Sequence, residues 1–203
     1  MIKLGITGTI ASGKTSVSIL LKRRGIPVFN SDQYAKMATH RGNPCFGKLI
    51  EILGKEVIGE DGDIQKEKMA AAIFSNEEKR LAVNAVVHPY VRKGMEHFFA
   101  MRKENFLCAA EVPLLFEAGY EDAFDEILVV TCDKDTAIKR MMEDRGYSLE
   151  EAQARYGRQI DPVKQAAKAD IVLDNSGSLK DLDRQVNILI RKYRGIGTND
   201  STA

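Results

Sequence analysis

The sequence feature that most limits what this chain can fold into is the octapeptide at residues 8–15, Gly-Thr-Ile-Ala-Ser-Gly-Lys-Thr. It fits the pattern G-x-x-x-x-G-K-[ST], and it lies between an apolar run at residues 2–7 and a segment of helical periodicity that ends at Gly25. In such a strand–loop–helix unit, backbone N–H groups and the positive helix end surround a phosphate. Lys14 would neutralise the β- and γ-phosphate oxygens, and the Thr15 hydroxyl would take one Mg²⁺ position. The alternative, a glycine-rich turn with a chance lysine, fits these flanking elements poorly. We therefore expect nucleotide binding by Gly8, Thr9, Ile10, Ala11, Ser12, Gly13, Lys14 and Thr15.

Four further apolar runs predict strands, and they occupy residues 26–30, 106–112, 126–131 and 171–174. Strands joined by helical crossovers form a parallel sheet that is covered on both faces. We therefore expect an α/β protein with the three-layer α/β/α phosphate-loop NTPase fold, a five-stranded parallel sheet, a helical insertion and a lid. The last helix, residues 178–194, has an apolar stripe, for which covering the sheet is favoured over forming a dimer seam. This stripe consists of Leu179, Leu182, Val186, Leu189 and Tyr193.

The spacing of the strands predicts the domain organisation. Residues 31–105 are helical in pattern and too long for an ordinary crossover, so they form an inserted helical subdomain. Residues 140–169 are dense in charge and form a second insertion, a lid. The nucleotide-binding core then comprises residues 1–30, 106–139 and 170–194, and residues 195–203 form a frayed tail.

Composition excludes several other classes of protein. With 30 Lys+Arg against 29 Asp+Glu, the net charge of +1 leaves no surplus for a dedicated nucleic-acid or lipid binder. No apolar run approaches the roughly 20 residues that span a bilayer, and no secretory signal is present, so we expect a cytoplasmic protein. The three cysteines have no C-x-x-C spacing and are expected to be buried thiols, and the three histidines are too scattered for a paired metal site.

A phosphate loop alone is compatible with a GTPase, an ATPase or a small-molecule kinase. Residues that would contact the phosphate acceptor must therefore distinguish these three classes. Asp32 follows the second strand and would emerge at the sheet edge where the loop opens. Its carboxylate could accept a hydroxyl proton during phosphoryl transfer or hold Mg²⁺ through water. It could equally be the N-cap of a helix that begins at Gln33, and position alone does not choose between the two.

Almost end to end, the chain resembles the dephospho-coenzyme A kinase family. The most specific stretch is Pro-Leu-Leu-Phe-Glu at residues 113–117. The rest of the likeness lies in residues 5–15, 30–32, 61–62, 88–89, 169–170 and 174–177, together with Val112, Arg140, Arg145 and Gln159. The resemblance implies transfer of the γ-phosphate of ATP, with Mg²⁺, to the ribose 3′-hydroxyl of dephospho-CoA, the last step of coenzyme A synthesis. Asp32 is then the implied base. Two departures from the family pattern are Thr9 and Ala11 in the loop and Asn30 in place of an acidic residue, which concentrates the base role on Asp32.

The resemblance also assigns an acceptor side. It places His88 near the acceptor, although a helix break at Pro89 would explain this dipeptide as well. Arg92 could bind an acceptor phosphate or only solvate a helix face. An apolar ledge suited to an adenine or pantetheine pocket, or to plain core packing, is formed by Pro113, Leu114, Leu115 and Phe116, with Glu117 adding a carboxylate of unknown purpose. Glu111, inside a strand, is weak evidence for a metal ligand.

Four arginines crowd the charged insertion: Arg140, Arg145, Arg155 and Arg158. Arginines on a closing lid can meet the charge of the transition state and exclude water, and we expect Arg140 and Arg145 to do so together with Lys14. Pairing with neighbouring acidic residues on solvated helices must explain some of these charges. After the fifth strand, Asn175 and Gly177 could contact adenine, or form a turn before the last helix.

Two rival functions remain. A nucleoside or nucleotide kinase would share the loop, the insertion and the lid, but the stretch 113–117 favours dephospho-CoA. A guanine-nucleotide switch would need an N-K-x-D motif, and Asn175-Ser176-Gly177 is not one. The expected partners are therefore ATP and dephospho-CoA, without nucleic acid or membrane, for a monomer or small homo-oligomer.

Overall fold

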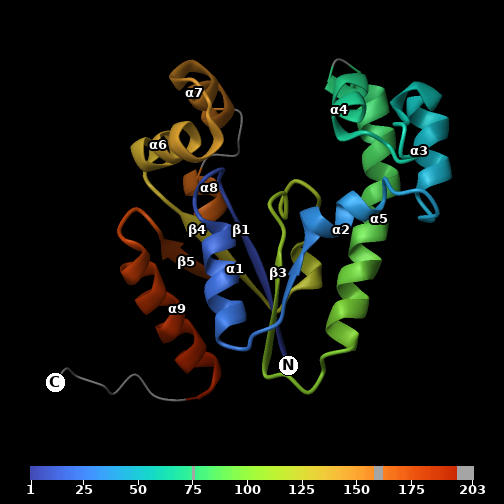
Figure 1. The fold of residues 1–203 in the computed structure, drawn as a ribbon. Helices are drawn as coiled ribbons and strands as arrows, with labels where there is room; N and C mark the ends of the chain where they lie inside the picture. The colour runs from blue at the N-terminus through green and yellow to red at the C-terminus, as the bar shows by residue number, and fades with distance from the viewer. Residues whose placement is uncertain (75, 158–161, 196–203) are drawn as a thin grey trace. The chain divides into compact units, whose positions relative to one another are not determined.

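The computed structural model describes residues 1–74, 76–157 and 162–195 (Figure 1). Its centre is a five-stranded parallel sheet in the order β2-β3-β1-β4-β5. The strands are β1 (Ile2–Gly8), β2 (Val28–Asn30), β3 (Leu107–Glu111), β4 (Glu126–Thr131) and β5 (Ile171–Asp174). The predicted phosphate-loop α/β fold is confirmed.

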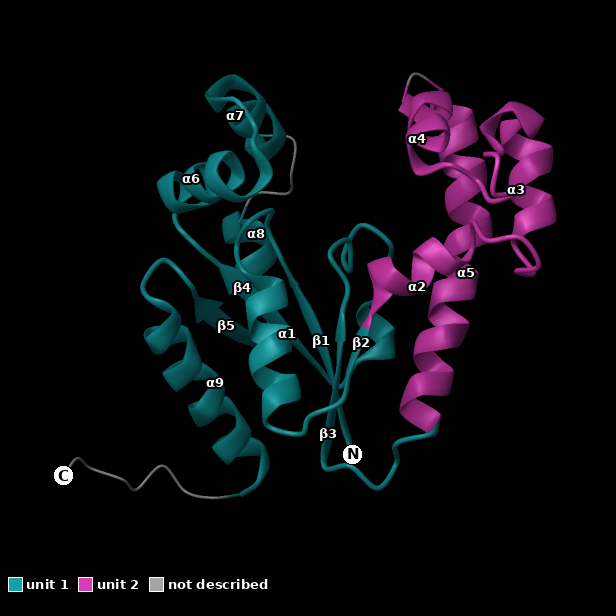
Figure 2. Ribbon diagram, viewed as in Figure 1, with its two compact units in different colours: residues 1–29, 101–203 teal, residues 30–100 magenta. Residues whose placement is uncertain are grey.

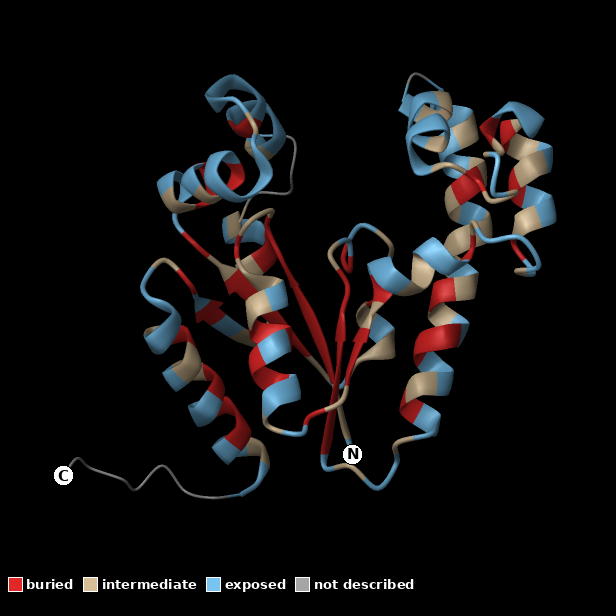
Figure 3. Ribbon diagram, in the orientation of Figure 1, coloured by how far each residue is buried: buried red, intermediate tan, exposed pale blue. Residues whose placement is uncertain are grey.

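One face of the sheet is covered by α1 (Lys14–Arg23) and α9 (Leu179–Tyr193). Strand residues that alternate along the chain, such as Leu4 and Ile6, point to this side and are fully buried, as Figure 3 shows for the strands. They pack with Leu182, Val186 and other residues of α9. The expectation that the last helix covers the sheet is therefore confirmed. Its first member, Leu179, is an exception because it is 61% exposed and lies outside the core.

After β4 the chain forms three helices, α6 (Lys134–Arg145), α7 (Leu149–Gly157) and α8 (Pro162–Ala166). Asp133 begins α6 as an N-cap, because its side chain accepts a hydrogen bond from the Thr136 N–H. The proposed lid boundary at residue 140 falls inside α6, and α8 packs on β4. Arg158, Gln159 and residues 196–203 of the expected tail lie outside the described part of the chain.

The chain divides into two compact units (Figure 2). Unit 1 comprises residues 1–29 and 101–203 and holds most of the sheet, whereas unit 2 comprises residues 30–100. Unit 2 is built from α2 (Ser31–Met37), α3 (Phe46–Leu53), the short 3-10 helix η1 (Lys55–Val57), α4 (Lys66–Phe74) and α5 (Glu77–Ala100). Its core contains Leu49, Leu53, Val57 and Val83.

One local expectation, the start of the second strand, and one alternative, a helix break at Pro89, were wrong. The second strand begins at Val28 rather than at residue 26, because Ile26 still bonds back to α1 through Leu21 O. Pro89 does not break a helix, since α5 continues through it to Ala100. A proline inside a helix removes one backbone hydrogen bond, but packing on both sides of the position outweighs this cost in a helix of 24 residues.

A capping box starts α9 and supports a stability prediction. Ser178 Oγ accepts the Asp181 N–H at 3.2 Å, and Asp181 Oδ2 accepts the Ser178 N–H at 3.2 Å. We expect Ser178→Ala to lower the free energy of unfolding by about 1 kcal/mol. Ser178→Thr keeps a hydroxyl at the N-cap and should retain most of the stabilisation that the cap provides. Urea unfolding followed by circular dichroism measures both variants.

The same cap should be sensitive to pH. Hydrogen bonds from Ser178 hold the pKa of Asp181 below its ordinary value of 3.8. A carboxyl whose pKa is depressed on folding stabilises the fold above its unfolded pKa and loses that contribution as pH falls through the folded pKa. The stability difference between the wild-type chain and Ser178→Ala should therefore narrow below about pH 4. A difference that widens on acidification would contradict this assignment.

Candidate nucleotide-binding and catalytic site

The loop between β1 and α1 is shaped by a close approach at its end. Gly13, the residue before α1, has φ of +95°, and a Cβ there would lie 2.0 Å from Asn175 Nδ2. Asn175 follows β5, is buried, and donates from Nδ2 to Ser12 O at 2.8 Å. Only glycine leaves room for this amide, so the loop backbone is fixed from the end of a strand far away in the sequence.

Lys14 and Thr15 form the charged and hydroxyl part of the site. Lys14 Nζ donates to the carbonyl oxygens of Gly8 at 2.9 Å and Thr9 at 2.7 Å, so the ammonium lies folded over the loop. Thr15 Oγ1 donates to Glu111 Oε1 at 2.8 Å. Glu111 is buried at the end of β3, and the parallel register that pairs Ile6 with Glu111 carries this carboxylate to the start of α1. Sequence spacing gave Glu111 only weak support, and the contact with Thr15 makes it part of the site.

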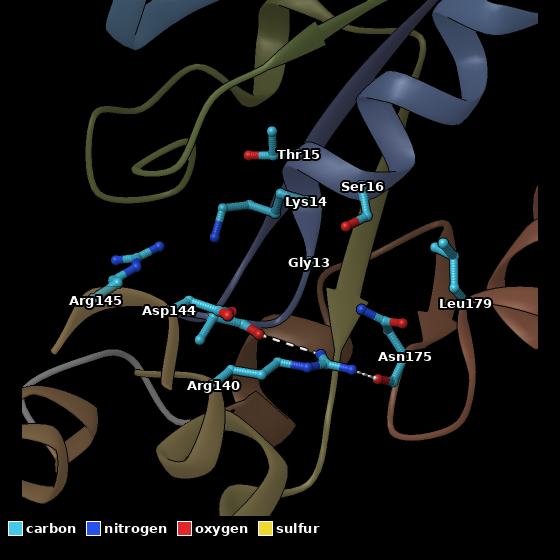
Figure 4. Close-up of a pocket in the computed structure, with 10 residues that line it drawn as sticks. Gly13, Lys14, Thr15, Ser16, Arg140, Asp144, Arg145, Asn175 and Leu179 are labelled. Atoms are coloured by element: carbon cyan, nitrogen blue, oxygen red, sulfur yellow. Dashed lines mark hydrogen bonds between the residues drawn. The ribbon is translucent and has the colours of Figure 1, made fainter. Parts of the chain in front are cut away.

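Arg140 links α6 to the loop and to β5. Its guanidinium donates to Ala11 O at 3.3 Å and to Asn175 O at 2.9 Å, as the dashed lines in Figure 4 mark. The pocket beside these contacts holds about 340 Å³. It is lined by Ala11, Gly13, Lys14, Thr15, Ser16, Arg140, Asp144, Arg145, Asn175 and Leu179. The structure therefore brings both expected arginines to the phosphate loop, and it adds Ser16, Asp144 and Leu179.

Thr9 and Ala11 stand in the loop where the family pattern has glycine, and the two residues differ in conformation and contacts. Ala11 has φ of +57°, which makes it the one described non-glycine residue with a positive φ. Its side chain packs with Ile10 against a small cluster on α6 and α7 that contains Ile138 and Met141. Thr9 is buried, and its hydroxyl is without a hydrogen-bond partner in the described structure.

Asp32 lies in the first turn of α2 and is exposed. The N-cap is Asn30, whose Oδ1 accepts the Gln33 N–H at 2.8 Å. The N-cap alternative for Asp32 is therefore wrong, and the departure of Asn30 from the family pattern has its own structural role. A carboxylate in the first turn is favoured by the positive end of the helix.

The proposed acceptor residues of unit 2 lie on α5. His88 is half-buried, and burial lowers its pKa below the ordinary value of 6.5. Arg92 Nε donates to Glu96 Oε1 at 3.3 Å, one turn further along the helix. This ion pair agrees with the alternative that Arg92 lies on a solvated helix face.

The stretch after β3 separates into buried and exposed residues. Leu115 and Phe116 are buried, so core packing accounts for both side chains. Leu114 is 58% exposed, Glu117 is exposed and Pro113 is intermediate, and these three keep the surface that a ligand would need. Gly177 belongs to the turn before α9 and does not line the pocket at the phosphate loop.

Three further findings concern the cysteines, groups of possible metal ligands, and membrane spans. Cys45, Cys108 and Cys132 are buried free thiols whose pKa values are raised by burial, which agrees with their expected role as small apolar residues. Within residues 1–74, 76–157 and 162–195, no group of three or more His, Cys, Asp or Glu side chains could hold a metal by itself. No helix in that part of the chain is long and apolar enough to cross a membrane.

A loop with Lys14 and Thr15 at the carboxyl edge of a parallel sheet, together with arginines from a later helix, defines the class of phosphate-loop kinases. A family model described as dephospho-CoA kinase matches residues 2–181. The chain belongs to the dephospho-CoA kinase family.

Individual relatives agree with this membership. A dephospho-CoA kinase from Bacillus licheniformis is 38% identical over 195 residues, which cover 95% of this chain and 97% of the relative. A solved structure of TT1252 from Thermus thermophilus has a TM-score of 0.82 at 34% identity and covers 94% of this chain and 97% of that one. A solved dephospho-CoA kinase from Campylobacter jejuni has a TM-score of 0.72 at 25% identity, with 95% and 98% covered.

The contact between Asn175 and the loop gives a testable prediction. We expect Asn175→Ala to leave Ser12 O without its buried partner and to lower the free energy of unfolding by about 1–3 kcal/mol. The same change should raise KM for ATP, because the loop backbone loses its lateral support. Chemical denaturation and initial rates measure the two effects. The control is Asn187→Ala, an exposed amide that bonds to Arg24, and an equal rise in KM there would contradict the assignment.

Proposed function

We propose that this chain transfers the γ-phosphate of ATP to the ribose 3′-hydroxyl of dephospho-CoA, which is the last step of coenzyme A synthesis. The observation that carries the proposal is a complete phosphate loop, with Lys14, Thr15 and Arg140 gathered on it, in a chain of the dephospho-CoA kinase family. The phosphate loop supports ATP as the phosphate donor, and membership of the family supports dephospho-CoA as the acceptor.

On the donor side, the loop and its arginines balance the charge of a triphosphate. Lys14 Nζ now bonds two loop carbonyls, and it would exchange them for β- and γ-phosphate oxygens. Arg140 is already oriented by Ala11 O and Asn175 O, and Arg145 lines the same pocket from the end of α6. Such preorganised cations stabilise charge that develops on the departing ADP. Asn175 would support the purine side of the nucleotide from the end of β5.

The donor atoms beside the loop fit Mg²⁺. Mg²⁺ prefers oxygen ligands, and the Thr15 hydroxyl and the Glu111 carboxylate lie 2.8 Å apart at the start of α1. Thr15 would contact the ion directly, and Glu111 would hold the hydroxyl or a water in its coordination shell. When bound, Mg²⁺ neutralises charge on the β- and γ-phosphates.

On the acceptor side, Asp32 is the proposed base. Its carboxylate would take the proton of the 3′-hydroxyl while the new O–P bond forms and the bond between the γ-phosphorus and the β–γ bridging oxygen breaks. The leaving ADP keeps the electron pair of the broken bond, and the proton resides on Asp32. His88, Arg92, Pro113, Leu114 and Glu117 are proposed to contact dephospho-CoA.

The base assignment is tested with Asp32→Asn. Because Asn30 caps α2, this change removes a charge without removing the cap, so the helix should persist. We expect kcat to fall by about 100-fold or more, with KM for ATP nearly unchanged. Lys14→Ala should lower turnover by orders of magnitude. Coupled measurement of ADP release with saturating dephospho-CoA checks both changes.

The matched control is Glu51→Gln, which removes an exposed carboxylate from α3 of the same unit and should leave kcat unchanged. Near-normal kcat in Asp32→Asn would remove the base assignment while leaving the donor site intact. A panel of nucleosides and nucleoside monophosphates as acceptors tests the rival kinase. A preference for one of them over dephospho-CoA would overturn the proposal.

The metal assignment predicts a different kinetic signature. Glu111→Gln keeps the size of the side chain and an oxygen for Thr15, but it removes the negative charge. We expect the Mg²⁺ concentration that gives half-maximal rate to rise several-fold, with KM for dephospho-CoA unchanged at saturating Mg²⁺. A titration of rate against Mg²⁺ at fixed ATP measures this effect. An unchanged titration would show that Glu111 only supports the fold.

A further inference from the structure

The helix that carries Asp32 depends on packing for its position. α2 has only seven residues, and helices of this length are not stable without tertiary contacts. Most of its side chains are exposed or half-buried, and Ser31 is the buried residue within it. The contacts between α2 and α5 therefore determine where Asp32 lies within unit 2.

Tyr34 contacts the neighbouring helix α5 at two residues. Its ring stacks on the Tyr90 ring of α5, with centroids 4.8 Å apart and planes inclined by 25°. Its other neighbour is Gly94, where a Cβ would lie 2.3 Å from Tyr34 Cε1 and Cζ. The ring therefore approaches the α5 backbone at a distance that only glycine allows, and it is held between two residues one turn apart.

Tyr90 is itself held in place by a hydrogen bond from Asn43. Asn43 Nδ2 donates to the Tyr90 hydroxyl at 2.9 Å, and Asn43 Oδ1 accepts the Cys45 N–H at 2.9 Å. Burial, and then a hydrogen bond with Tyr90, raises the pKa of Tyr34 above its ordinary value. These contacts leave the Tyr34 ring little freedom to change its position.

We propose that Tyr34 is a positioning residue for the reaction: by its contacts with Tyr90 and Gly94 it places Asp32, two residues earlier on α2. The inference rests on the proposed function, in which Asp32 is the base. Rates of phosphoryl transfer depend steeply on the placement of such groups, and a shift of about 1 Å can cost 100-fold. Tyr34 itself contacts neither nucleotide nor acceptor in this role.

The first test is a set of substitutions at Tyr34. We expect Tyr34→Ala to lower kcat by about 10- to 100-fold, with KM for ATP within about twofold of the wild-type value. Tyr34→Phe keeps the stacked ring and should retain most of the activity. The matched control is Met37→Ala, which truncates an exposed side chain of the same helix and should leave kcat unchanged. A rise in KM for dephospho-CoA with kcat unchanged would show that Tyr34 binds the acceptor, and it would overturn the positioning role.

The decisive test is the double variant of Tyr34→Ala and Asp32→Asn. If Tyr34 acts through Asp32, the double variant is no slower than Asp32→Asn alone, because the base that Tyr34 places is already gone. If the two losses multiply, Tyr34 has only a structural role and the inference is wrong. Should Tyr34→Ala fail to fold by circular dichroism, Tyr34→Leu serves the same cycle, since it keeps apolar burial but cannot stack.

A substitution on the opposite side of the contact provides an independent check. Gly94→Ala places a methyl group where the Tyr34 ring lies, so it should lower kcat in the wild-type chain and have little effect on the Tyr34→Ala background. Near-normal kcat in Asp32→Asn would refute the base assignment of the proposed function. A large loss in Asp32→Asn together with normal kcat in both Tyr34→Ala and Gly94→Ala would refute the positioning role alone.

Discussion

The arrangement of the donor site depends on one crowded contact, that between Gly13 and the side-chain amide of Asn175. The amide occupies the place where any side chain at position 13 would lie, and it holds Ser12 O from the end of β5. Arg140 then bonds the Asn175 carbonyl and Ala11 O, so α6 is attached to the same two segments. Loop, strand end and arginine helix are thereby fixed together by one buried hydrogen bond and two that are partly buried. In such surroundings hydrogen bonds are stronger and unpaired groups more costly, which keeps the arrangement rigid.

In the proposed function, the position of Lys14 lowers the cost of binding a triphosphate at this site. Its ammonium bonds the carbonyl oxygens of Gly8 and Thr9, which are neutral acceptors. Phosphate oxygens carry negative charge, so they attract the ammonium by ion pairing as well as by hydrogen bonding. The exchange therefore favours the nucleotide, while the loop keeps Lys14 near its working position beforehand. The side chain does not have to be ordered from solution when ATP binds, which reduces the entropy cost of binding.

Sequence patterns predicted the local parts of this structure well and the contacts between distant segments poorly. The five strands, the loop and the role of α9 followed from periodicity and glycine placement, because these are properties of neighbouring residues. The bond between Thr15 and Glu111 depends on which residue of β3 pairs with Ile6, and no local pattern specifies that register. Asn30 and Asp32 are both good N-caps by type, so only the backbone could show which one caps α2.

The same distinction applies to Leu179, which belonged to a regular apolar stripe in the sequence. The stripe begins one turn before the helix reaches the sheet, so its first member lies in the pocket beside the phosphate loop instead of in the core. The stretch after β3 differs for a similar reason. Leu115 and Phe116 were equally suited to a ligand or to the interior, and the fold places them inside. Apolar character predicts that a side chain leaves water, but only the tertiary structure determines what it contacts.

Ala11 shows that a departure from glycine in the loop can be stabilised by the structure around it. A left-handed conformation costs an alanine about 1–2 kcal/mol relative to the right-handed one, and glycine avoids this cost. Here the methyl group packs with Ile138 and Met141, so burial offsets part of the strain. The carbonyl oxygen of the same residue accepts a hydrogen bond from the Arg140 guanidinium, and this bond connects the strained peptide to α6. A loop residue that would be unfavourable by itself therefore joins the phosphate loop to the helix that carries the arginines, through both its side chain and its backbone.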